Sequence, residues 1–424
     1  MPDEPQTETP RRTGFMAPLQ VSEYRRLLTS NAFWWQAMWM EMIVVGWLVL
    51  EMTDSAWQVA LIGFYRMFPL LIFGFFSGPI VDGLGRRRTM LASQVVNLLV
   101  NGAVVALLLS DRLQYWHLAV GALLLGVVWS LDWTARRSIL PDLVGRSRTV
   151  DAMLVDAFVG NFSRVAGPLL GGAIIDALGP EGCFSTLALL AVASLIVLWT
   201  LPQDSPVARS SATDASAWRL MVDGLKYVRH NQPILGVLLI TVVMNFLTFP
   251  HMALLPVFAR DILGQGPVGL GILGGASGVG FFFGLIAVNR VRHSVGGGWL
   301  FAAGSALMSA GLVGFAFSTD YHTSVALLVF SGIGQAAFNV MQSSIVLLSA
   351  SDEMRSRAMG ALLLAIGGMP LGRIQIGALA EGFGAPIAVG VMCAVSAVLI
   401  LAVAGGLPEF RRTRQDEVDA GVDT

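Results

Sequence analysis

The stretch "GPIVDGLGRRRTM", residues 78–90, decides how this chain folds, because it sets glycines, an aspartate and three consecutive arginines between two long apolar runs. The run before it covers about residues 57–80, and the run after it covers 90–109. A helix of about 20 apolar residues crosses a hydrocarbon core about 30 Å thick. The polar turn is therefore predicted to lie at a membrane surface, with one crossing helix on each side.

The composition of the whole chain agrees with this prediction. Of 424 residues, 55% are hydrophobic and only 13% are charged, whereas soluble proteins carry roughly 25% charged residues. The formal net charge of -1 gives no reason to expect a nucleic-acid partner. Both cysteines, Cys183 and Cys393, fall in apolar runs, so a disulfide framework is not expected. These features predict a membrane protein.

About twelve runs are long enough to span a bilayer, and each is predicted to be a helix because lipid offers backbone amides no hydrogen-bond partner. The runs are too long and too uniformly apolar for the strands of a barrel, which need about ten alternating residues. The fold class is therefore an all-α membrane protein. The predicted spans are residues 31–51, 57–80, 90–109, 115–134, 151–175, 183–201, 233–256, 268–288, 298–318, 323–349, 358–380 and 386–407.

The arginines predict the orientation. With both termini in the cytoplasm, the outer loops keep only Arg112 and Arg260, which is the asymmetry of the positive-inside rule for an even number of spans. The arginines of the inner loops and tail are then Arg86, Arg87, Arg88, Arg136, Arg137, Arg146, Arg148, Arg290, Arg292, Arg355, Arg357, Arg411, Arg412 and Arg414.

A polar interval divides the chain into two halves that resemble each other. "RSRTVDAMLVDAFVGNFSR" at 146–164 parallels "RSRAMGALLLAIGGMPLGR" at 355–373, and duplicated halves recur in transporters. The interval contains "AWRLMVDGLKYVRH", which is either an amphipathic helix on the inner membrane surface or a plain linker. The predicted organisation is a cytoplasmic segment 1–30, a six-helix bundle 31–201, a linker 202–232, a second six-helix bundle 233–407 and a cytoplasmic tail 408–424.

The opening stretch resembles the loop 2–3 signature of the major facilitator superfamily through Gly78, Asp82, Gly85, Arg86 and Arg87, with a departure at Gly83. Stretches such as "ARRSILPDLV" and "LLPVFARDILG" are similar to those of its enterobactin-exporter-like branch, also called transmembrane secretion effectors. The resemblance implies two pseudo-symmetric bundles in a bacterial-type inner membrane. It also implies that Asp82, Arg86 and Arg87 help to latch the cytoplasmic side.

The fifth span carries a second motif of the same superfamily. Gly167, Pro168, Gly171 and Gly172 resemble the core of a sequence associated with exporters, although Ser163 replaces its leading glycine. Glycine and proline make a kinked, closely packed helix that can pivot. The motif favours export over uptake; ordinary helix packing is the alternative interpretation.

Charged residues inside the spans are the candidate functional groups, because an ionised group there costs roughly 2.5–3.5 kcal/mol on insertion scales. Glu41 and Arg66 lie at similar depth in the first two spans and are predicted to pair. Glu41, Asp132 and Asp156 are candidate proton-coupling groups. For Arg66, Arg164 and Arg373, a structural ion pair and a place in the substrate cavity are both open interpretations.

Neutral polar side chains at helical spacing suggest the cavity wall. The tenth span carries Gln335, Asn339 and Gln342, the seventh carries Asn245 between two threonines, and Trp39 lies close to Glu41. A similar stripe in the third span, 94–101, is interpreted as interhelical hydrogen bonding, and the same interpretation is open for the others.

Other function classes lack their motifs. The single lysine, Lys226, is not part of a phosphate-binding loop, the histidines are scattered, and no cofactor, metal or catalytic cluster is expected. The chain is therefore predicted to be a monomeric secondary transporter and not an enzyme, with a small-molecule substrate, protons and the bilayer as its partners. Proton-coupled efflux of a drug- or siderophore-like amphiphile is favoured. Uptake by symport is the alternative, followed by a non-transporting sensor.

Overall fold

The computed structural model describes residues 16–202, 227–291, 294–351 and 354–412, and this part of the chain is helical and contains no β-strand. Its first half contains a 3-10 turn (Ala17–Gln20), α1 (Ser22–Thr53), α2 (Ala56–Leu84), α3 (Arg86–Leu109), α4 (Tyr115–Ser138), the short α5 (Leu140–Val144), a 3-10 turn (Arg146–Arg148) and α6 (Thr149–Trp199).

The second half contains α8 (Gln232–Val243), four short elements (Met244–Thr248, Phe249–Leu254, α9 at Leu255–Val257, and Phe258–Ile262), α10 (Pro267–Val291), α11 (Gly297–Ala316), α12 (Tyr321–Ser349), α13 (Arg355–Ile366), α14 (Met369–Phe383), α15 (Ala385–Gly406) and α16 (Pro408–Arg412). Eleven helical segments of the described part are long and apolar enough to cross a membrane. The predicted all-α membrane fold is confirmed.

Helix α6 accounts for the difference between eleven segments and twelve predicted spans. Its 51 residues would extend about 75 Å at 1.5 Å per residue, more than twice the hydrocarbon thickness. Gly179 interrupts it with non-helical backbone angles (φ 71°, ψ 178°), and Pro180 follows. A positive φ is accessible to glycine at little cost. The two arms on either side of Gly179 are the predicted fifth and sixth spans, joined by a very short turn.

Two predicted spans are less regular than expected. The seventh continues from α8 through a π turn, a 3-10 turn, α9 and a second π turn. Pro250 and Pro256 lie in this region and supply no amide hydrogen to an α-helical ladder. The eleventh span consists of α13 and α14, which meet at Gly367 and Gly368 just before Pro370.

Two helices begin earlier than predicted. Helix α1 begins at Ser22, so the end of the expected segment 1–30 is already helical, and the Tyr24 hydroxyl donates to the carbonyl of Ala152 at 2.8 Å. Helix α3 begins at Arg86, so the arginines of the opening stretch form its first turn. Gly85, at φ 91°, is the sharp turn between α2 and α3. The expected amphipathic helix lies mostly outside the described residues.

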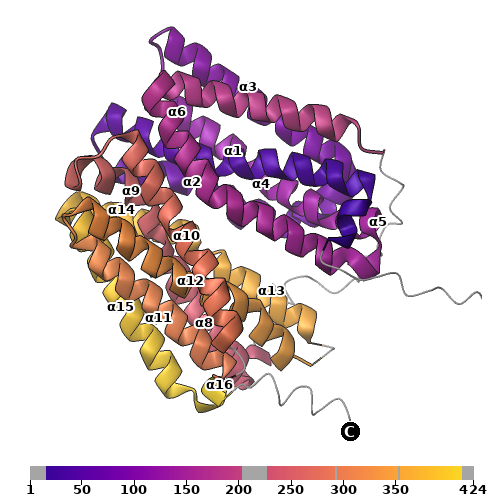
Figure 1. Cartoon of the computed structure of the whole chain (residues 1–424), viewed down its shortest axis with the longest axis vertical. Helices are drawn as coiled ribbons and strands as arrows, with labels where there is room; N and C mark the ends of the chain where they lie inside the picture. The colour runs from indigo at the N-terminus through magenta and orange to yellow at the C-terminus, as the bar shows by residue number, and fades with distance from the viewer. Residues whose placement is uncertain (1–15, 203–226, 292–293, 352–353, 413–424) are drawn as a thin grey trace, which may run out of the picture.

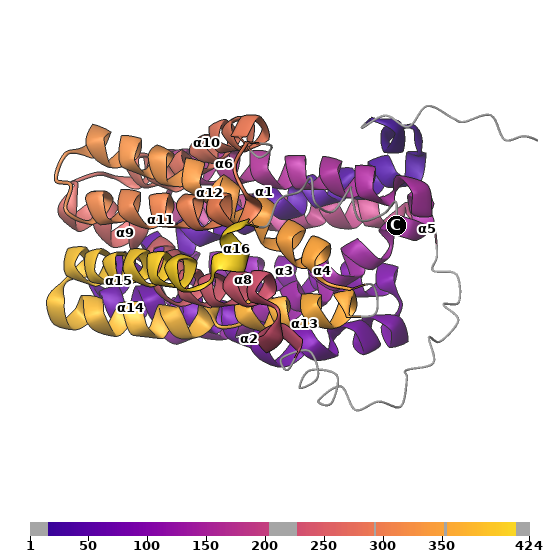
Figure 2. The same ribbon diagram turned by 90° about the horizontal axis from the view of Figure 1, so that it is seen from below.

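The helices form two bundles. Helix α1 packs along α6, and α2 packs along α4, while α12 packs against α10 and α11 in the second half. The main contacts between the bundles join α6 to α10 and α14 to α2. The bundles converge near α9 and α14 and diverge toward α5 and α16 (Figure 1), and Figure 2 shows the same pairing from a second direction. We call the converging end, which carries Asp54 and Gly384, the outer end, following the predicted orientation, and the opposite end the inner end.

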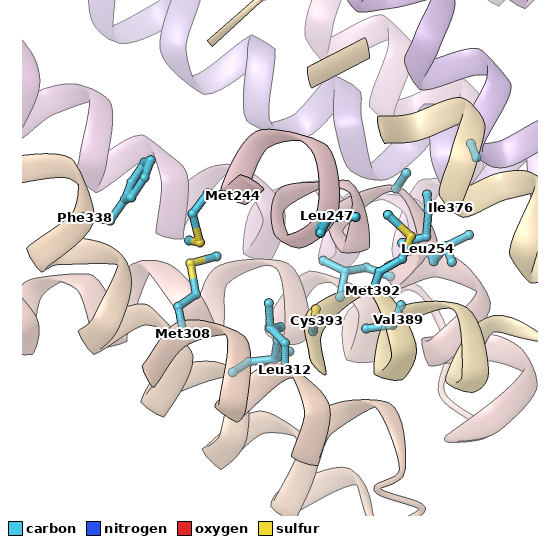
Figure 3. Packing of buried hydrophobic residues seen from close by; sticks show 14 of the residues in the cluster. Met244, Leu247, Leu254, Met308, Leu312, Phe338, Ile376, Val389, Met392 and Cys393 are labelled. Carbon is cyan, nitrogen blue, oxygen red and sulfur yellow. The ribbon is translucent and has the colours of Figure 1, made fainter. Parts of the chain in front are cut away.

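The core of the second bundle packs large apolar side chains around the irregular seventh span. Met244 and Leu247 of this span face Met308 and Leu312 of α11, with Met392 of α15 beside them (Figure 3). Methionine adapts its shape to irregular gaps. The interruption of the helix therefore leaves a filled core.

Candidate functional site

A cavity of about 90 Å³ lies between the two bundles, near the middle of the spans. Helices α1, α2 and α4 line one side, and the seventh span and α14 line the other. Its residues are Met38, Trp39, Glu41, Met42, Val45, Gly46, Val59, Ile62, Gly63, Arg66, Met67, Ala122, Trp129, Met252, Ala253, Pro256 and Arg373. Most of the wall is apolar, with a few charged groups, which is the usual character of a small-molecule site.

Glu41 and Arg66 pair on the wall of this cavity, as the sequence predicts. Arg66 donates from Nε to Oε1 of Glu41 at 3.0 Å and from Nη2 to Oε2 at 3.2 Å. Its remaining terminal nitrogen donates to the carbonyl of Leu125 at 3.0 Å, and its Cζ lies 5.9 Å from the ring centre of Trp129. The two-bond geometry fixes both groups.

The pair also borders a smaller pocket of about 20 Å³ inside the first bundle, lined by Gln94, Asn97 and Asn101 of α3. A volume of this size holds about one water molecule. The α3 stripe therefore faces a polar interior and not the central cavity.

Arg373 lies across the cavity from the pair. No described residue accepts a hydrogen bond from it, and its Nε is buried without a partner. Its guanidinium packs against Gly63 of α2, because a Cβ added to Gly63 would overlap Nη1 and lie 3.1 Å from Cζ. The absence of a side chain at Gly63 is what admits the guanidinium.

Arg164 lies at the contact of the two bundles and joins three helices. It donates to the side-chain oxygens of Gln335 and, at 3.3 Å, Ser277. Its Cζ lies 5.5 Å from the ring centre of Trp39, which separates it from the cavity. Arg164 and Gln335 thus connect the bundles and do not line the 90 Å³ cavity.

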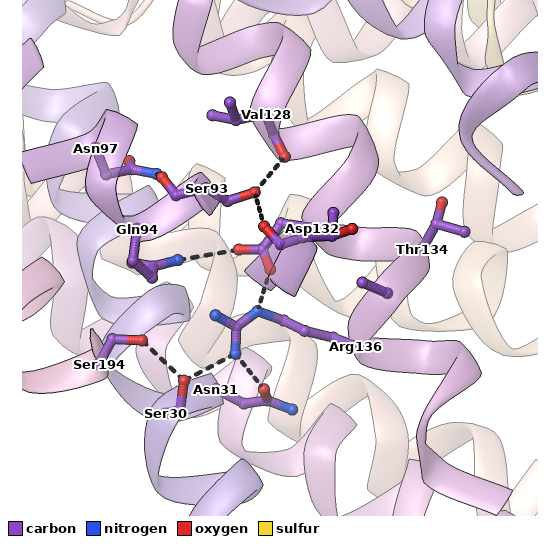
Figure 4. Close-up of polar contacts among 12 residues, drawn as sticks. Ser30, Asn31, Ser93, Gln94, Asn97, Val128, Asp132, Thr134, Arg136 and Ser194 are labelled. Carbon is purple, nitrogen blue, oxygen red and sulfur yellow. Dashed lines mark hydrogen bonds and ion pairs between the residues drawn. The ribbon is translucent and has the colours of Figure 1, made fainter. Parts of the chain in front are cut away.

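Asp132 belongs to a separate buried network in the first bundle (Figure 4). It forms an ion pair with Arg136 at 3.1 Å and accepts from Gln94 at 3.0 Å. Arg136 donates to Ser30 and, at 2.6 Å, to Asn31. The two charges neutralise each other and are held by neutral side chains of α1 and α3, while Nη2 of Arg136 is buried without a hydrogen-bond partner. This is the arrangement of a structural network.

Asp156 is attached to the same network through Asn31, whose amide donates to it at 2.6 Å. The structure therefore separates the three candidate carboxylates. Glu41 lines the cavity, whereas Asp132 and Asp156 lie in the first bundle toward the inner end.

The polar stripes of the second bundle mostly bond one another. Gln342 donates to the hydroxyl of Thr241 at 2.9 Å, and Asn245 donates to the carbonyl of Thr241. Both are buried, while Asn339 is exposed. Like Gln335, none of them lines the cavity. Gln335 and Gln342 bond neighbouring helices, and Asn245 bonds the backbone of its own span, so contacts among the helices account for the buried members of the stripes.

The loop 2–3 motif makes its contacts within the first bundle. Arg86 pairs with Asp142 of α5, and Arg87 donates to the carbonyls of Leu198 and Trp199 at 3.2 and 2.7 Å. Asp82 is exposed and has no ion pair with any described residue. Gly78 has open space around it, so no neighbouring helix packs on this position in this conformation.

The helix 5 motif makes the close approaches expected of it. A Cβ at Gly172 would overlap the carbonyl oxygen of Pro267 and lie 3.1 Å from the Cα of Gly271, across the bundle boundary. A Cβ at Gly167 would overlap Trp39 of α1, and Pro168 contacts Gly274 of α10. The non-helical angles inside α6 fall at Gly179 and not at Pro168.

Two polar contacts join the bundles at the outer end. Arg260 pairs with Asp54 and donates to the carbonyl of Leu50 at 3.1 Å. Glu381 of α14 accepts from the hydroxyl of Ser55 at 3.2 Å and from the amide of Trp57 at 3.3 Å. Together with the glycine contacts of α6, they close the outer end.

Part of the cavity wall cannot be recognised in the sequence. Trp129, Met252 and Pro256 line it, but they come from distant parts of the chain and carry no motif. The role of Gly63 could not be predicted either, because one glycine in an apolar run does not reveal which side chain packs on it. The depth of Trp129 in its span, close to that of Arg66, was the one available signal.

Comparisons with known proteins agree with this architecture. A family model described as transmembrane secretion effector matches residues 13–420. The chain is 26% identical over 351 residues to the multidrug efflux pump Tap of Mycolicibacterium fortuitum, covering 81% of this chain and 85% of that protein. It is 21% identical over 351 residues to the staphyloferrin A transporter of Staphylococcus aureus, covering 82% and 86%.

Solved structures of transporters share the fold. The nucleoside transporter NupG superposes with a TM-score of 0.69 at 13% identity, covering 91% of this chain and 98% of that one. A bacterial homologue of the human lysosomal transporter Spinster, in an inward-facing and unoccupied conformation, gives 0.71 at 12% identity, with 95% and 99% covered. At these identities the likeness concerns the fold alone.

Proposed function

Because the chain belongs to the transmembrane secretion effector family of the major facilitator superfamily, we propose that it exports a small amphiphilic molecule by proton-coupled alternating access. Family membership makes it a multi-pass membrane transporter and not an enzyme. Two relatives carry the names of a multidrug efflux pump and a staphyloferrin A transporter, and these names support the choice of a drug- or siderophore-like substrate.

The observation that carries the proposal is the Glu41–Arg66 pair on the wall of a cavity between two bundles. A proton on this carboxylate would remove its negative charge and weaken its two hydrogen bonds to the arginine. Protonation of Glu41 would therefore loosen its hold on Arg66 and change the charge facing the substrate. This is a direct physical link between proton binding and substrate binding.

The contacts at the two ends support alternating access. The outer end is held by glycine contacts and by the pairs of Arg260 and Glu381, while the motif arginines of the inner end bond within their own bundle. In the opposite state, Asp82, Arg86 and Arg87 would latch the inner end, and the contact of Gly172 with α10 would open.

The proposed setting is a bacterial inner membrane with both termini in the cytoplasm, as the arginine distribution predicts. Bundles 31–201 and 233–407 of a monomer would rock about the central cavity, with the linker 202–232 between them. Labelling of a cysteine at Leu84, an exposed residue at the inner end of α2, should fail from outside intact cells and succeed in inverted vesicles.

Inverted membrane vesicles test direction and coupling together. Substrates would first be identified by a resistance screen in a host without its own efflux pumps. An exporter driven by protons should then accumulate substrate when the vesicle interior is acidified. Glu41→Gln should abolish the response to the pH gradient while binding persists, and Glu51→Gln, an exposed carboxylate change on the same helix, should have no effect. Uphill transport by Glu41→Gln with a full pH response would exclude Glu41 as the proton site.

A second candidate, uptake by proton symport, is favoured by one observation. The partner of Glu41 is an arginine on the cavity wall, so a proton on Glu41 frees a cation there. A substrate with an anionic group would then bind together with the proton, which is the linkage that symport requires. In the same vesicles, a symporter would move substrate out of an acidified interior.

A further inference from the structure

The charges where the two bundles meet do not balance. Three arginines, Arg66, Arg164 and Arg373, lie there, and Glu41 is the one carboxylate that bonds any of them among the described residues. Glu41 uses both oxygens on Arg66. An unpaired buried charge costs several kcal/mol, so a free arginine in a cavity invites an anion from outside the protein.

Arg373 is the free cation that faces the cavity. It lines the cavity, has no carboxylate partner among the described residues, and packs closely against Gly63. Arg164 also has a buried Nε without a partner, but its Nη2 donates to Gln335 and Ser277, and the residue lies behind Trp39 and does not line the cavity. A fixed guanidinium with free donors matches the geometry of a carboxylate or sulfonate group.

On the wall of the cavity, unpaired hydrogen-bond donors outnumber free charged acceptors. The ring nitrogens of Trp39 and Trp129 and the Nε of Arg373 are buried N–H donors without an acceptor. Each buried donor left unsatisfied costs about 1–3 kcal/mol. The carboxylate of Glu41, the one charged acceptor of the wall, is already bonded. This wall is therefore suited to a ligand that brings acceptor oxygens.

We propose that the cavity selects amphiphilic organic anions, with the acidic group of the ligand on Arg373 and its apolar body against the methionines and tryptophans. The methionines Met38, Met42, Met67 and Met252 line the cavity and can adapt to different apolar bodies. The inference rests on the proposed function in one respect, because it takes this cavity as the substrate site. It holds for either direction of transport.

Binding of two matched probes to the full-length protein in lipid nanodiscs tests the proposal. Dansyl-phenylalanine carries a carboxylate, and dansyl-phenylalanine amide differs from it only by being neutral there. Energy transfer from tryptophan reports binding of both. The wild type should prefer the carboxylate about tenfold or more, the range expected for a charged hydrogen bond. Arg373→Gln should bring the ratio close to one, and Arg373→Lys should keep part of the preference.

Two further variants separate position from charge. Gly63→Ala keeps every charge but displaces the guanidinium, so it should lower the ratio of the carboxylate affinity to the neutral-probe affinity. Gly405→Ala of α15, where the added Cβ meets open space far from the cavity, is its control for added volume. Arg290→Gln, an exposed change at the inner end of α10, is the control for lost charge and should bind like the wild type.

Three results would overturn the proposal: no binding or no preference for the carboxylate in the wild type, a preference that survives Arg373→Gln, or a clearly lower melting temperature of Arg373→Gln. The last would show that the arginine has a structural partner. Transport is measured separately in proteoliposomes. Carboxylate preference without transport of either probe would refute the transport proposal but not the anion site. Transport of both probes without a preference would refute the anion site but not the transport proposal.

Discussion

A single methyl group at Gly172 should shift the balance between the two ends of the transporter. In this structure, a Cβ at Gly172 overlaps the carbonyl oxygen of Pro267 and lies 3.1 Å from the Cα of Gly271. Both atoms belong to the backbone of α10, so rotation of a side chain cannot relieve the overlap. Overpacking of this kind costs typically 1–3 kcal/mol. The cost applies only while α6 and α10 are in contact, so Gly172→Ala should favour the state with the outer end open by a factor of about 5 to 150.

Distances between spin labels on the inner ends of the bundles measure this shift. Cysteines at Leu84 of α2 and Leu348 of α12 would carry the labels, since both residues are exposed and the native Cys183 and Cys393 are fully buried. Gly172→Ala should reduce the population with long distances.

The neighbouring Gly171 supplies the control. A Cβ there would lie 3.5 Å from the Cα of Met40, an ordinary contact. Gly171→Ala should therefore leave the distance distribution as it is in the wild type. If Gly172→Ala and Gly171→Ala gave the same distribution, the contact between α6 and α10 would not hold the outer end closed.

Three more predictions follow from described contacts. Gly78→Ala should shift the same distances in the opposite direction to Gly172→Ala, because Gly78 has open space here and would meet a neighbour only when the inner end closes; an unchanged distribution would contradict its role in the latch. Asp132→Asn should lower the free energy of unfolding by about 3 kcal/mol, because it leaves the buried Arg136 without its ion-pair partner, and thermal melting in detergent would measure this; a loss below 1 kcal/mol would argue against a structural network. Asp54→Asn should change the spin-label populations by less than about 1 kcal/mol, because Asp54 is largely exposed and its pair with Arg260 is screened by solvent.

The sequence predicted the spans well because lipid imposes one strong rule on every crossing segment. It predicted less about their ends, since Ser22–Ser30 of α1 and the first turn of α3 are polar yet helical. It also missed the interruptions in the seventh and eleventh spans. The first depends on Pro250 and Pro256 together with the core that fills around them, and the second falls at Gly367 and Gly368. Single-sequence periodicity does not report tertiary packing.

The candidate site was predicted in parts. The pairing of Glu41 with Arg66 followed from equal depth in adjacent spans, and the structure contains it. The stripe of Gln335 and Gln342 predicted a polar surface but could not say whether its partners were substrate or other helices. Partners of a polar side chain come from distant helices, so their identity requires the packed structure.

The turn at Gly179 has a consequence for the surrounding lipid. It ties the outer ends of the fifth and sixth spans so closely that neither arm of α6 can shift along the membrane normal without carrying the other. The apolar Leu178 beside it is two-thirds exposed. A shift of the two arms along the membrane normal would therefore move apolar surface toward or away from the lipid headgroups. Turnover should therefore vary with the acyl-chain length of the host bilayer, since each ångström of hydrophobic mismatch costs a fraction of a kcal/mol.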